Sequence, residues 1–337
     1  MVLRAVDPRI DSDFQQWFAI LSRSEALHQP PGSGSWRPED WRARALPADP
    51  SVVYALATFS DGDLPVAAIA IRLNRDDNQH FAETHLHVDP PFRRRGVGSA
   101  ALAATEEMIL RLGRTDVGAV APEGPDNIDP RPSRFFAPRH GYVIGDEAIR
   151  RDIAWPMDQQ HVAELRREWA AHASGYHFER WVGPASNRRA HQMADLIGRM
   201  PTETPYANHA FEAEQWDLAR VRQHEQTVDE MGRDLLTTVA IETSSGEVVG
   251  YTELTVSRAE PGTAWQWDTF VASEHRGHRL GGLMKLANLD VFALRGYNTQ
   301  RICTHNSSQN GPMIAVNEAL GATITGSKVL WKKKLTS

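Results

Sequence analysis

The chain has 337 residues, of which 41% are hydrophobic and 24% are charged, and its formal net charge is −6. This length is typical of two domains that each bury a core, and the negative charge argues against nucleic acid as the main partner. No apolar run approaches the roughly 20 residues that cross a bilayer, and the lone Cys303 cannot form an internal disulfide. We therefore expect a cytoplasmic protein without a membrane segment.

The first half of the sequence predicts a regular order of short elements, βααβββαβαβ. A strand at 2–6 is followed by helices at 14–21 and 37–41. The other predicted strands are 52–59, 66–73, 83–88, 117–121, 142–144 and 149–155, and the other predicted helices are 99–112 and 133–139. Ser60-Asp61-Gly62-Asp63 is predicted to be a hairpin turn between two of these strands.

A loop rich in arginine and glycine lies between the fourth strand and the long helix. It reads Asp89-Pro90-Pro91-Phe92-Arg93-Arg94-Arg95-Gly96-Val97-Gly98-Ser99. Glycine lets the backbone come close to a ligand, and the unpaired N–H groups of a first helical turn favour an anion. The loop therefore predicts a diphosphate site, with a solvated basic helix cap as the alternative. Neither a P-loop nor a dinucleotide fingerprint is present.

A second copy of this loop stands in the other half of the chain. It reads Val271-Ala272-Ser273-Glu274-His275-Arg276-Gly277-His278-Arg279-Leu280-Gly281, with Arg279 where a middle glycine is expected. In each copy a valine precedes the first arginine by 5 residues, and the last loop glycine precedes a helix-closing glycine by 15. The matching positions are Val88 and Val271, Gly98 and Gly281, and Gly113 and Gly296. Two loops in register predict a tandem repeat.

The second half repeats the element order of the first. Residues 157–174 have helical spacing and predict a connecting helix. After it we expect strands at 176–182, 235–242, 248–257, 266–271, 301–304 and 328–333, and helices at 187–200, 213–233, 282–294 and 310–320. The predicted domains are therefore 1–156 and 176–337, joined by a helix at 157–175.

The Arg-x-x-Gly-x-Gly loop and the element order resemble the GNAT (GCN5-related) N-acetyltransferase superfamily. The resemblance implies an α/β (α+β) fold of two tandem GNAT domains, each a mixed, mostly antiparallel splayed sheet flanked by helices. The tandem arrangement is similar to that of mycothiol synthase. The resemblance also implies acetyl-CoA as a cosubstrate, with its pantetheine arm between the fourth and fifth strands. The 14 histidines are scattered without a metal-ligand spacing, so we expect no metal.

The resemblance assigns the same cofactor-binding positions in both repeats. In the first repeat they are Leu86, His87, Val88, Arg93, Arg94, Arg95, Gly96, Val97, Gly98 and Ser99. In the second repeat they are Phe270, Val271, Arg276, Gly277, His278, Arg279, Leu280, Gly281, Asn306 and Asn310. Asn310 resembles an asparagine that binds the pantetheine arm, but it also suits a helix N-cap.

Acetyl transfer to an amine needs a base for the ammonium proton. By strand alternation Glu83 and His85 share one face, and matching the two valines places Asp268 opposite His85 and Gln266 opposite Glu83. The candidate catalytic residues are therefore Glu83, His85, Asp268 and Glu253, with a solvated or edge-facing polar residue as the alternative reading of each. The sequence does not rank them.

The usual tyrosine acid of this family is absent from both repeats. Its place is held by Ala137 in the first repeat and by Asn317 in the second. Tyr142, Cys303 or water could protonate the leaving thiolate instead. The expected function is N-acyl transfer from acetyl-CoA to a primary amine of small-molecule size, by a monomer or homodimer. The alternative is a CoA-binding or sensor protein in which one or both domains are inactive.

Overall fold

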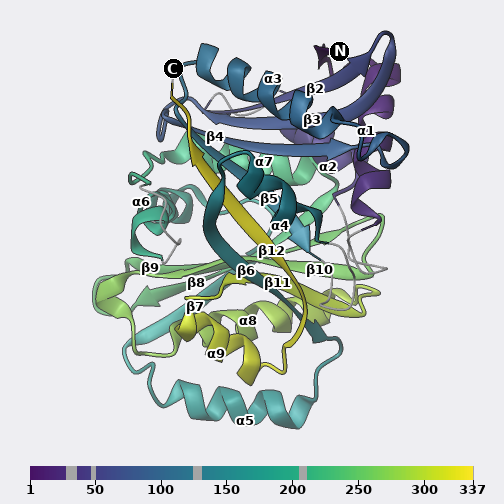
Figure 1. Ribbon diagram of the computed structural model, residues 1–337. Coiled ribbons are helices and arrows are strands. Elements are labelled where there is room, and N and C mark those ends of the chain that lie inside the picture. Colours follow the sequence, from purple (N-terminus) through teal and green to yellow (C-terminus); the bar gives the residue numbers. More distant parts are fainter. Residues whose placement is uncertain (28–35, 47–50, 124–130, 205–210, 337) are drawn as a thin grey trace. The chain divides into compact units, whose positions relative to one another are not determined.

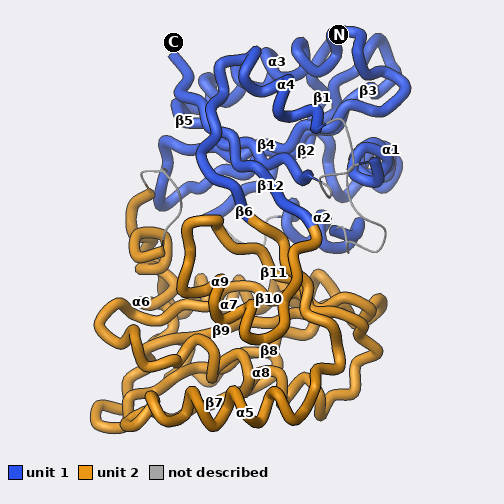
Figure 2. Tube along the Cα trace, turned by 60° about the horizontal axis from the view of Figure 1, so that its bottom comes forward, with its two compact units in different colours: residues 1–148, 326–337 blue, residues 149–325 orange. Residues whose placement is uncertain are grey.

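The structure is a computed structural model and describes residues 1–27, 36–46, 51–123, 131–204 and 211–336. It is a mixed α/β protein (Figure 1). The chain folds into two compact units (Figure 2). Unit 1 consists of residues 1–148 and 326–337, and unit 2 consists of residues 149–325. The resemblance stated above implies that the segments 30–36 and 201–206 influence substrate choice, and both lie partly outside the described residues.

Unit 1 holds one sheet with helices on it. Its strands run in the order β1-β2-β3-β4-β5-β12. Its strands are β1 (Val2–Val6), β2 (Val52–Asp61), β3 (Leu64–Asn74), β4 (Phe81–Val88), β5 (Asp116–Glu123) and most of β12 (Thr323–Lys334). Its helices are α1 (Asp11–Glu25), α2 (Pro38–Ala45), the 3-10 turn η1 (Pro90–Phe92), α3 (Val97–Arg111) and α4 (Pro132–Arg139).

Unit 2 repeats this arrangement. Its strands run in the order β6-β11-β10-β9-β8-β7. They are β6 (Val143–Ala154, of which 149–154 belong here), β7 (Tyr176–Val182), β8 (Arg233–Glu242), β9 (Val248–Ser257), β10 (Thr263–Val271) and β11 (Arg301–Ser307). Its helices are α5 (Gln159–Ala170), α6 (Asn187–Glu203), α7 (Leu218–Glu230), the 3-10 turn η2 (Ser273–His275), α8 (Leu280–Arg295) and α9 (Gly311–Ala319).

The last strand of the chain completes the sheet of the first repeat. Residues Ser327 to Lys334 of β12 pair antiparallel with β5, and Val329 and Trp331 are buried in the core of unit 1. Conversely, β6 follows the first repeat in sequence but lies next to β11 in unit 2. Each compact unit therefore contains the final strand of the other sequence repeat. The predicted repeats 1–156 and 176–337, in contrast, are continuous in sequence. The repeat bounds stay a prediction.

Most predicted elements are present, and two differ clearly from the prediction. The two strands predicted at 142–144 and 149–155 form one continuous strand, β6. The helix predicted at 213–233 is shorter, because α7 begins after the N-cap Asp217, whose side chain accepts from the Arg220 N–H at 2.8 Å. It ends at Glu230, and Gly232 follows with a positive φ of 66°.

The helix between the repeats, α5, is fastened to α8. Asp158 caps its N-terminus by accepting from Gln160 N–H at 2.9 Å, and Leu165 and Trp169, four residues apart, are buried. A Cβ at Gly282 of α8 would lie 2.4 Å from Cζ3 of Trp169. The glycine therefore lets the indole lie directly on the α8 backbone.

Replacement of Trp169 by alanine is expected to destabilise unit 2 by about 3–5 kcal/mol, because it leaves a large cavity beside α8. Urea unfolding of the intact chain measures this loss. Leu294→Ala on the same helix is the control, since Leu294 is 84% exposed and should change stability by at most about 0.5 kcal/mol. Equal effects of the two substitutions would show that α5 contributes no packing energy.

Candidate functional site

The fourth and fifth strands of unit 1 separate part-way along their length. They pair in parallel only from Phe81 with Asp116 to Thr84 with Ala119. Beyond this point β5 continues beside β12, and β4 continues beside β3. The predicted contacts Leu86, His87 and Val88 all lie in the separated part of β4. Backbone groups on that edge are available to an extended ligand, which could add to the sheet as a strand would.

Unit 2 shows the same separation with one added feature. Strands β10 and β11 pair only from Thr263 with Arg301 to Trp265 with Cys303. Phe270 and Val271 therefore lie in the separated part of β10, and Asn306 lies in that of β11. A β-bulge interrupts the pairing of β10 with β9 between Gln266 and Thr269.

The bulge changes the comparison of the two fourth strands. No register shift separates β3 from β4, so only β10 carries the extra residue. Asp268 lies within the bulge, and its side chain is exposed. The predicted match of Gln266 with Glu83 is wrong, because Gln266 lies before the bulge. Its buried side chain donates to the Glu253 carbonyl at 2.6 Å, whereas Glu83 is half-buried.

The two loops that are rich in arginine and glycine, 89–99 and 271–281, have the same backbone shape. Arg94 and Gly96 have positive φ values of 62° and 80° in the first loop. Gly277 and Arg279 have φ values of 88° and 56° at the same two places in the second. Each loop thus puts one glycine and one arginine in the left-handed region, and an arginine there costs roughly 1–2 kcal/mol. The positions with positive φ are set by the loop shape, so Arg279 can replace the expected glycine.

Each loop leads into the N-terminus of a helix. The first intrahelical bonds are Ala100 N to Gly96 O in α3 and Leu283 N to Arg279 O in α8. The preceding N–H groups have no acceptor within the helix and carry the positive end of its dipole. They belong to Val97, Gly98 and Ser99 in the first loop and to Leu280, Gly281 and Gly282 in the second. Both loops can therefore bind an anion.

The first arginine of each loop points back into the protein. Arg93 donates to the Val88 carbonyl at 3.2 Å and to the Ser24 hydroxyl at 2.8 Å. Arg276 donates to the Val271 carbonyl at 3.1 Å and to the Glu203 carbonyl at 2.9 Å. Both guanidinium groups thus connect the strand end to the first helix of their repeat, α1 or α6. Arg94, Arg95 and Arg279 are exposed, whereas His278 is half-buried against Tyr176.

In unit 1 the two predicted polar residues contact each other. His85 Nε2 lies 3.1 Å from Glu83 Oε1. Burial opposes ionisation of Glu83, but the His85 hydrogen bond and the charges of His85, Arg72 and Lys328 lower its pKa to about 2. A carboxylate with this pKa is ionised at neutral pH and accepts a proton poorly.

In unit 2 the predicted carboxylates meet a histidine that the sequence did not indicate. His224 Nε2 on α7 lies 3.1 Å from Glu253 Oε2, and Trp267 and Trp216 lie 6.0 and 6.3 Å from the imidazole between ring centroids. Burial acts against protonation of His224, but the Glu253 charge and hydrogen bond raise its pKa. The sequence could not indicate His224, because it lies four residues after Arg220, which is buried, in a helix that is rich in charged residues.

Asp268 has the proton affinity of a general base. Asp268 keeps contact with solvent, but the protein atoms around its carboxyl group remove part of its hydration. This desolvation, together with the negative charge of Glu253, raises the pKa of Asp268 to about 6. The His224 charge acts in the opposite direction. A base whose pKa is near the working pH accepts a proton most usefully. The structure thus distinguishes Asp268 from Glu83, which the sequence could not do.

The remaining candidates have simpler roles. Cys303 is fully buried, and burial raises the pKa of its thiol to about 12, so it stays protonated at neutral pH. Burial and the charge of Glu106 raise the pKa of Tyr142 as well. Asn310 is an N-cap, because its side-chain oxygen accepts from Met313 N–H at 3.3 Å.

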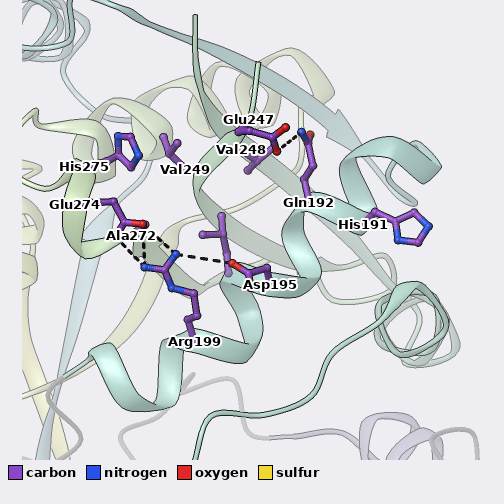
Figure 3. Close-up of a pocket in the computed structure, with 11 residues that line it drawn as sticks. His191, Gln192, Asp195, Arg199, Glu247, Val248, Val249, Ala272, Glu274 and His275 are labelled. Atoms are coloured by element: carbon purple, nitrogen blue, oxygen red, sulfur yellow. Dashed lines mark hydrogen bonds and ion pairs between the residues drawn. The ribbon is translucent and has the colours of Figure 1, made fainter. Parts of the chain in front are cut away.

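A surface depression of about 470 Å³ lies beside the second loop (Figure 3). It is lined by α6, the start of β9 and the turn η2. Several of its polar and charged side chains bond to one another: Arg199 donates to Glu274 at 2.8 Å, and Gln192 donates to Glu247 at 2.7 Å. These bonds between the lining side chains explain the depression as a part of the packing of α6 against β9 and η2. It contains none of the predicted catalytic residues.

Comparison with known proteins agrees with this geometry. Residues 15–118 match the acetyltransferase (GNAT) family. A tandem GNAT protein from the clavulanic acid biosynthesis pathway superimposes with a TM-score of 0.77 at 24% identity, covering 100% of this chain and 99% of the other. The chain has the tandem GNAT fold. No curated protein sequence matches it.

Two further GNAT structures are similar over almost the whole chain. A GCN5-related N-acetyltransferase from Sphaerobacter thermophilus has a TM-score of 0.66 at 17% identity, covering 99% of this chain and 95% of the other. The glucosamine N-acetyltransferase region of a fungal multi-domain β-N-acetylglucosaminidase has a TM-score of 0.65 at 14% identity, covering 98% of this chain and 38% of the other. The GNAT fold supports acyl transfer in general.

Two kinds of feature are absent from the residues that the structure describes. No group of three or more His, Cys, Asp or Glu side chains in them could hold a metal ion. No helix in the same part of the chain is long and apolar enough to span a membrane.

Proposed function

We propose that the chain transfers acetyl from acetyl-CoA to a small-molecule primary amine, and that the second GNAT repeat carries out the chemistry. The observation that carries this proposal is the arrangement along β10. One strand combines an open backbone edge, a following helix N-terminus at the loop, and a carboxylate with a pKa of about 6 at its bulge. Strand β4 has a similar open edge and a following helix N-terminus, but the pKa of its carboxylate Glu83 is about 2.

Each part of this strand has a task in the proposed reaction. The N–H groups of Leu280, Gly281 and Gly282 hold the diphosphate, and the open edge of β10 holds the pantetheine arm. Holding both reactants in one cleft supplies much of the rate through proximity. Backbone N–H groups of β10 polarise the thioester carbonyl.

Asp268 is proposed to take the proton of the arriving ammonium group. The free amine then attacks the thioester carbonyl carbon, a C–N bond forms, and the C–S bond breaks. The attacking nitrogen loses its second proton to become an amide, and the departing thiolate of CoA takes up that proton through water. His224 and Glu253 contact each other and form an ion pair when His224 is protonated. The charges of both residues act on the pKa of Asp268. The aromatic rings of Trp267 and Trp216 border the same cluster and suit an organic cation.

The first repeat is proposed to bind CoA or to support the second repeat without catalysis. Its loop has the same backbone shape, but its candidate base Glu83, with a pKa of about 2, takes up a proton only weakly. The names of two structural neighbours, a clavulanic acid pathway protein and a glucosamine N-acetyltransferase region, support a small-molecule acceptor. We further propose that the protein acts in the cytoplasm as a monomer or homodimer.

The alternative is a protein that binds CoA without transferring acetyl. It is favoured by Ala137 and Asn317, which occupy the places of the family's tyrosine acid in the two repeats. Release of free thiol from acetyl-CoA in the presence of a panel of primary amines separates the two functions. We expect thiol release that depends on one class of amine. Stoichiometric binding of acetyl-CoA without thiol release from any amine would contradict transfer and support the alternative.

A further inference from the structure

A buried lysine lies in α8, the helix that follows the second loop. Lys285 is 2% exposed, between the buried Met284 and Leu286. A lysine is rarely this buried unless its ammonium group has a partner, because removal of a charge from water is costly. The Nζ atom donates to the Asn317 side-chain oxygen at 2.7 Å. The reaction proposed above gives this lysine no role.

The lysine fixes the orientation of two asparagines. An ammonium group can only donate, so it must meet the oxygen of the Asn317 amide. The Asn317 nitrogen is then the free end, and it donates to the Asn306 side-chain oxygen at 2.5 Å. Because the Asn306 oxygen accepts this bond, the Asn306 side-chain nitrogen takes no part in these hydrogen bonds. Three residues on α8, α9 and β11 thus form one directed chain of hydrogen bonds.

This series of hydrogen bonds ends in the part of β11 that does not pair with β10. Asn306 lies three residues beyond Cys303, the last residue of β11 that pairs with β10, and it is half-buried, whereas Asn317 is completely buried. Satisfied buried polar networks rigidify the groups they contain. The amide of Asn306 is therefore held at the edge of the gap with its N–H donor unused.

We propose that Lys285 and Asn317 are positioning residues that make Asn306 a fixed hydrogen-bond donor to the pantetheine arm of acetyl-CoA in the second repeat. This inference rests on the proposed function, because it needs acetyl-CoA in that gap. It assigns Asn317, at the place of the missing tyrosine, a role in holding the ligand. Burial also lowers the pKa of Lys285 to about 7, so the ammonium form prevails below this pH.

A double-mutant cycle tests the inference. Acetyl-CoA is titrated calorimetrically into the full chain carrying Gly98→Glu, which blocks the first loop, at a pH below the Lys285 pKa of about 7. Asn306→Ala removes the donor and is expected to weaken binding about tenfold, and Lys285→Met about fivefold. In the Asn306→Ala background, Lys285→Met should weaken binding less than about twofold, because its effect passes through Asn306.

Asn317→Asp is the matched variant of nearly identical shape. Its carboxylate accepts from both neighbours, so the Asn306 amide must turn its nitrogen inward and present an oxygen to the gap. Binding should weaken about as much as in Asn306→Ala, with cooperative thermal unfolding retained. A merely structural role of Asn317 would leave the affinity of this folded variant unchanged.

The outcomes separate the inference from the proposed function. Suppose that the Gly98→Glu protein binds acetyl-CoA and that the variants of the cycle bind it equally well, or that Lys285→Met and Asn306→Ala act additively. The positioning role of Lys285 and Asn317 is then wrong, and the proposed function stands. If the Gly98→Glu chain and the unchanged chain both fail to bind, the proposed function is wrong and the inference falls with it. If only the Gly98→Glu chain fails, ligand binding belongs to the first repeat and the inference is overturned.

Discussion

Asp268→Asn is expected to lower the turnover number for acetyl transfer by about 10²–10⁴-fold, the usual contribution of a positioned general base. The affinity for acetyl-CoA should not change, because the asparagine keeps the size of the side chain and the loop is untouched. Thiol release under saturating substrates measures the first quantity, and calorimetric titration the second. Glu168→Gln is the matched control, since it neutralises an exposed carboxylate on α5.

The pH profile gives an independent reading of the same residue. Asp268 acts as a base only when ionised, and its pKa is raised from 3.8 to about 6. Activity should therefore be present above this pH and fall as the pH drops through about 6. If Glu83→Gln abolishes transfer and Asp268→Asn does not, the first repeat is the catalytic one and our assignment is wrong.

Gly281→Glu is expected to abolish binding of acetyl-CoA at the second repeat, because it places a negative charge in the first turn of α8, where the diphosphate would lie. A Cβ at Gly281 makes only ordinary contacts, 3.6 Å from Thr269 and 3.7 Å from Met313, so the fold should tolerate the substitution. Gly281→Gln is the control of equal size, and the difference between the two variants isolates the charge.

Gly98→Glu is the corresponding change in the first repeat. Two equivalents should bind to the unchanged chain and one to each glutamate variant, as calorimetry measures directly. Only Gly281→Glu should abolish transfer. If both variants still bind two equivalents, the ligand does not use the helix N-termini. If the unchanged chain binds one equivalent, the variant that abolishes binding names the occupied repeat.

Periodicity and loop composition predicted much of the fold. The hairpin of β2 and β3, the glycines that end α3 and α8, and the repeated loop depend on short-range sequence patterns, and all are present. Gly113 and Gly296 do have positive φ values, 76° and 65°. These features could be predicted because each depends on residues that are close in sequence.

The candidate site was predictable only in part. Asp268 and Glu253 were recognised as possible bases, but His224 was not, because it comes from a helix about 30 residues before Glu253 in the sequence. The bulge at Trp267 and Asp268 could not be seen either, since it depends on the pairing of β10 with β9. One inserted residue changes which side chains correspond between the repeats.

The sequence by itself determined that the chain repeats one α/β unit and that each unit has a glycine and arginine loop before a helix. Only the tertiary structure decided that β12 completes the sheet of unit 1, that Arg93 and Arg276 tie strand ends to helices, and that Asp268 differs from Glu83 in proton affinity. The physical reason is that pKa values and strand partners depend on neighbours far apart in the sequence. Desolvation and nearby charges raise the pKa of one carboxylate to about 6 and lower that of the other to about 2.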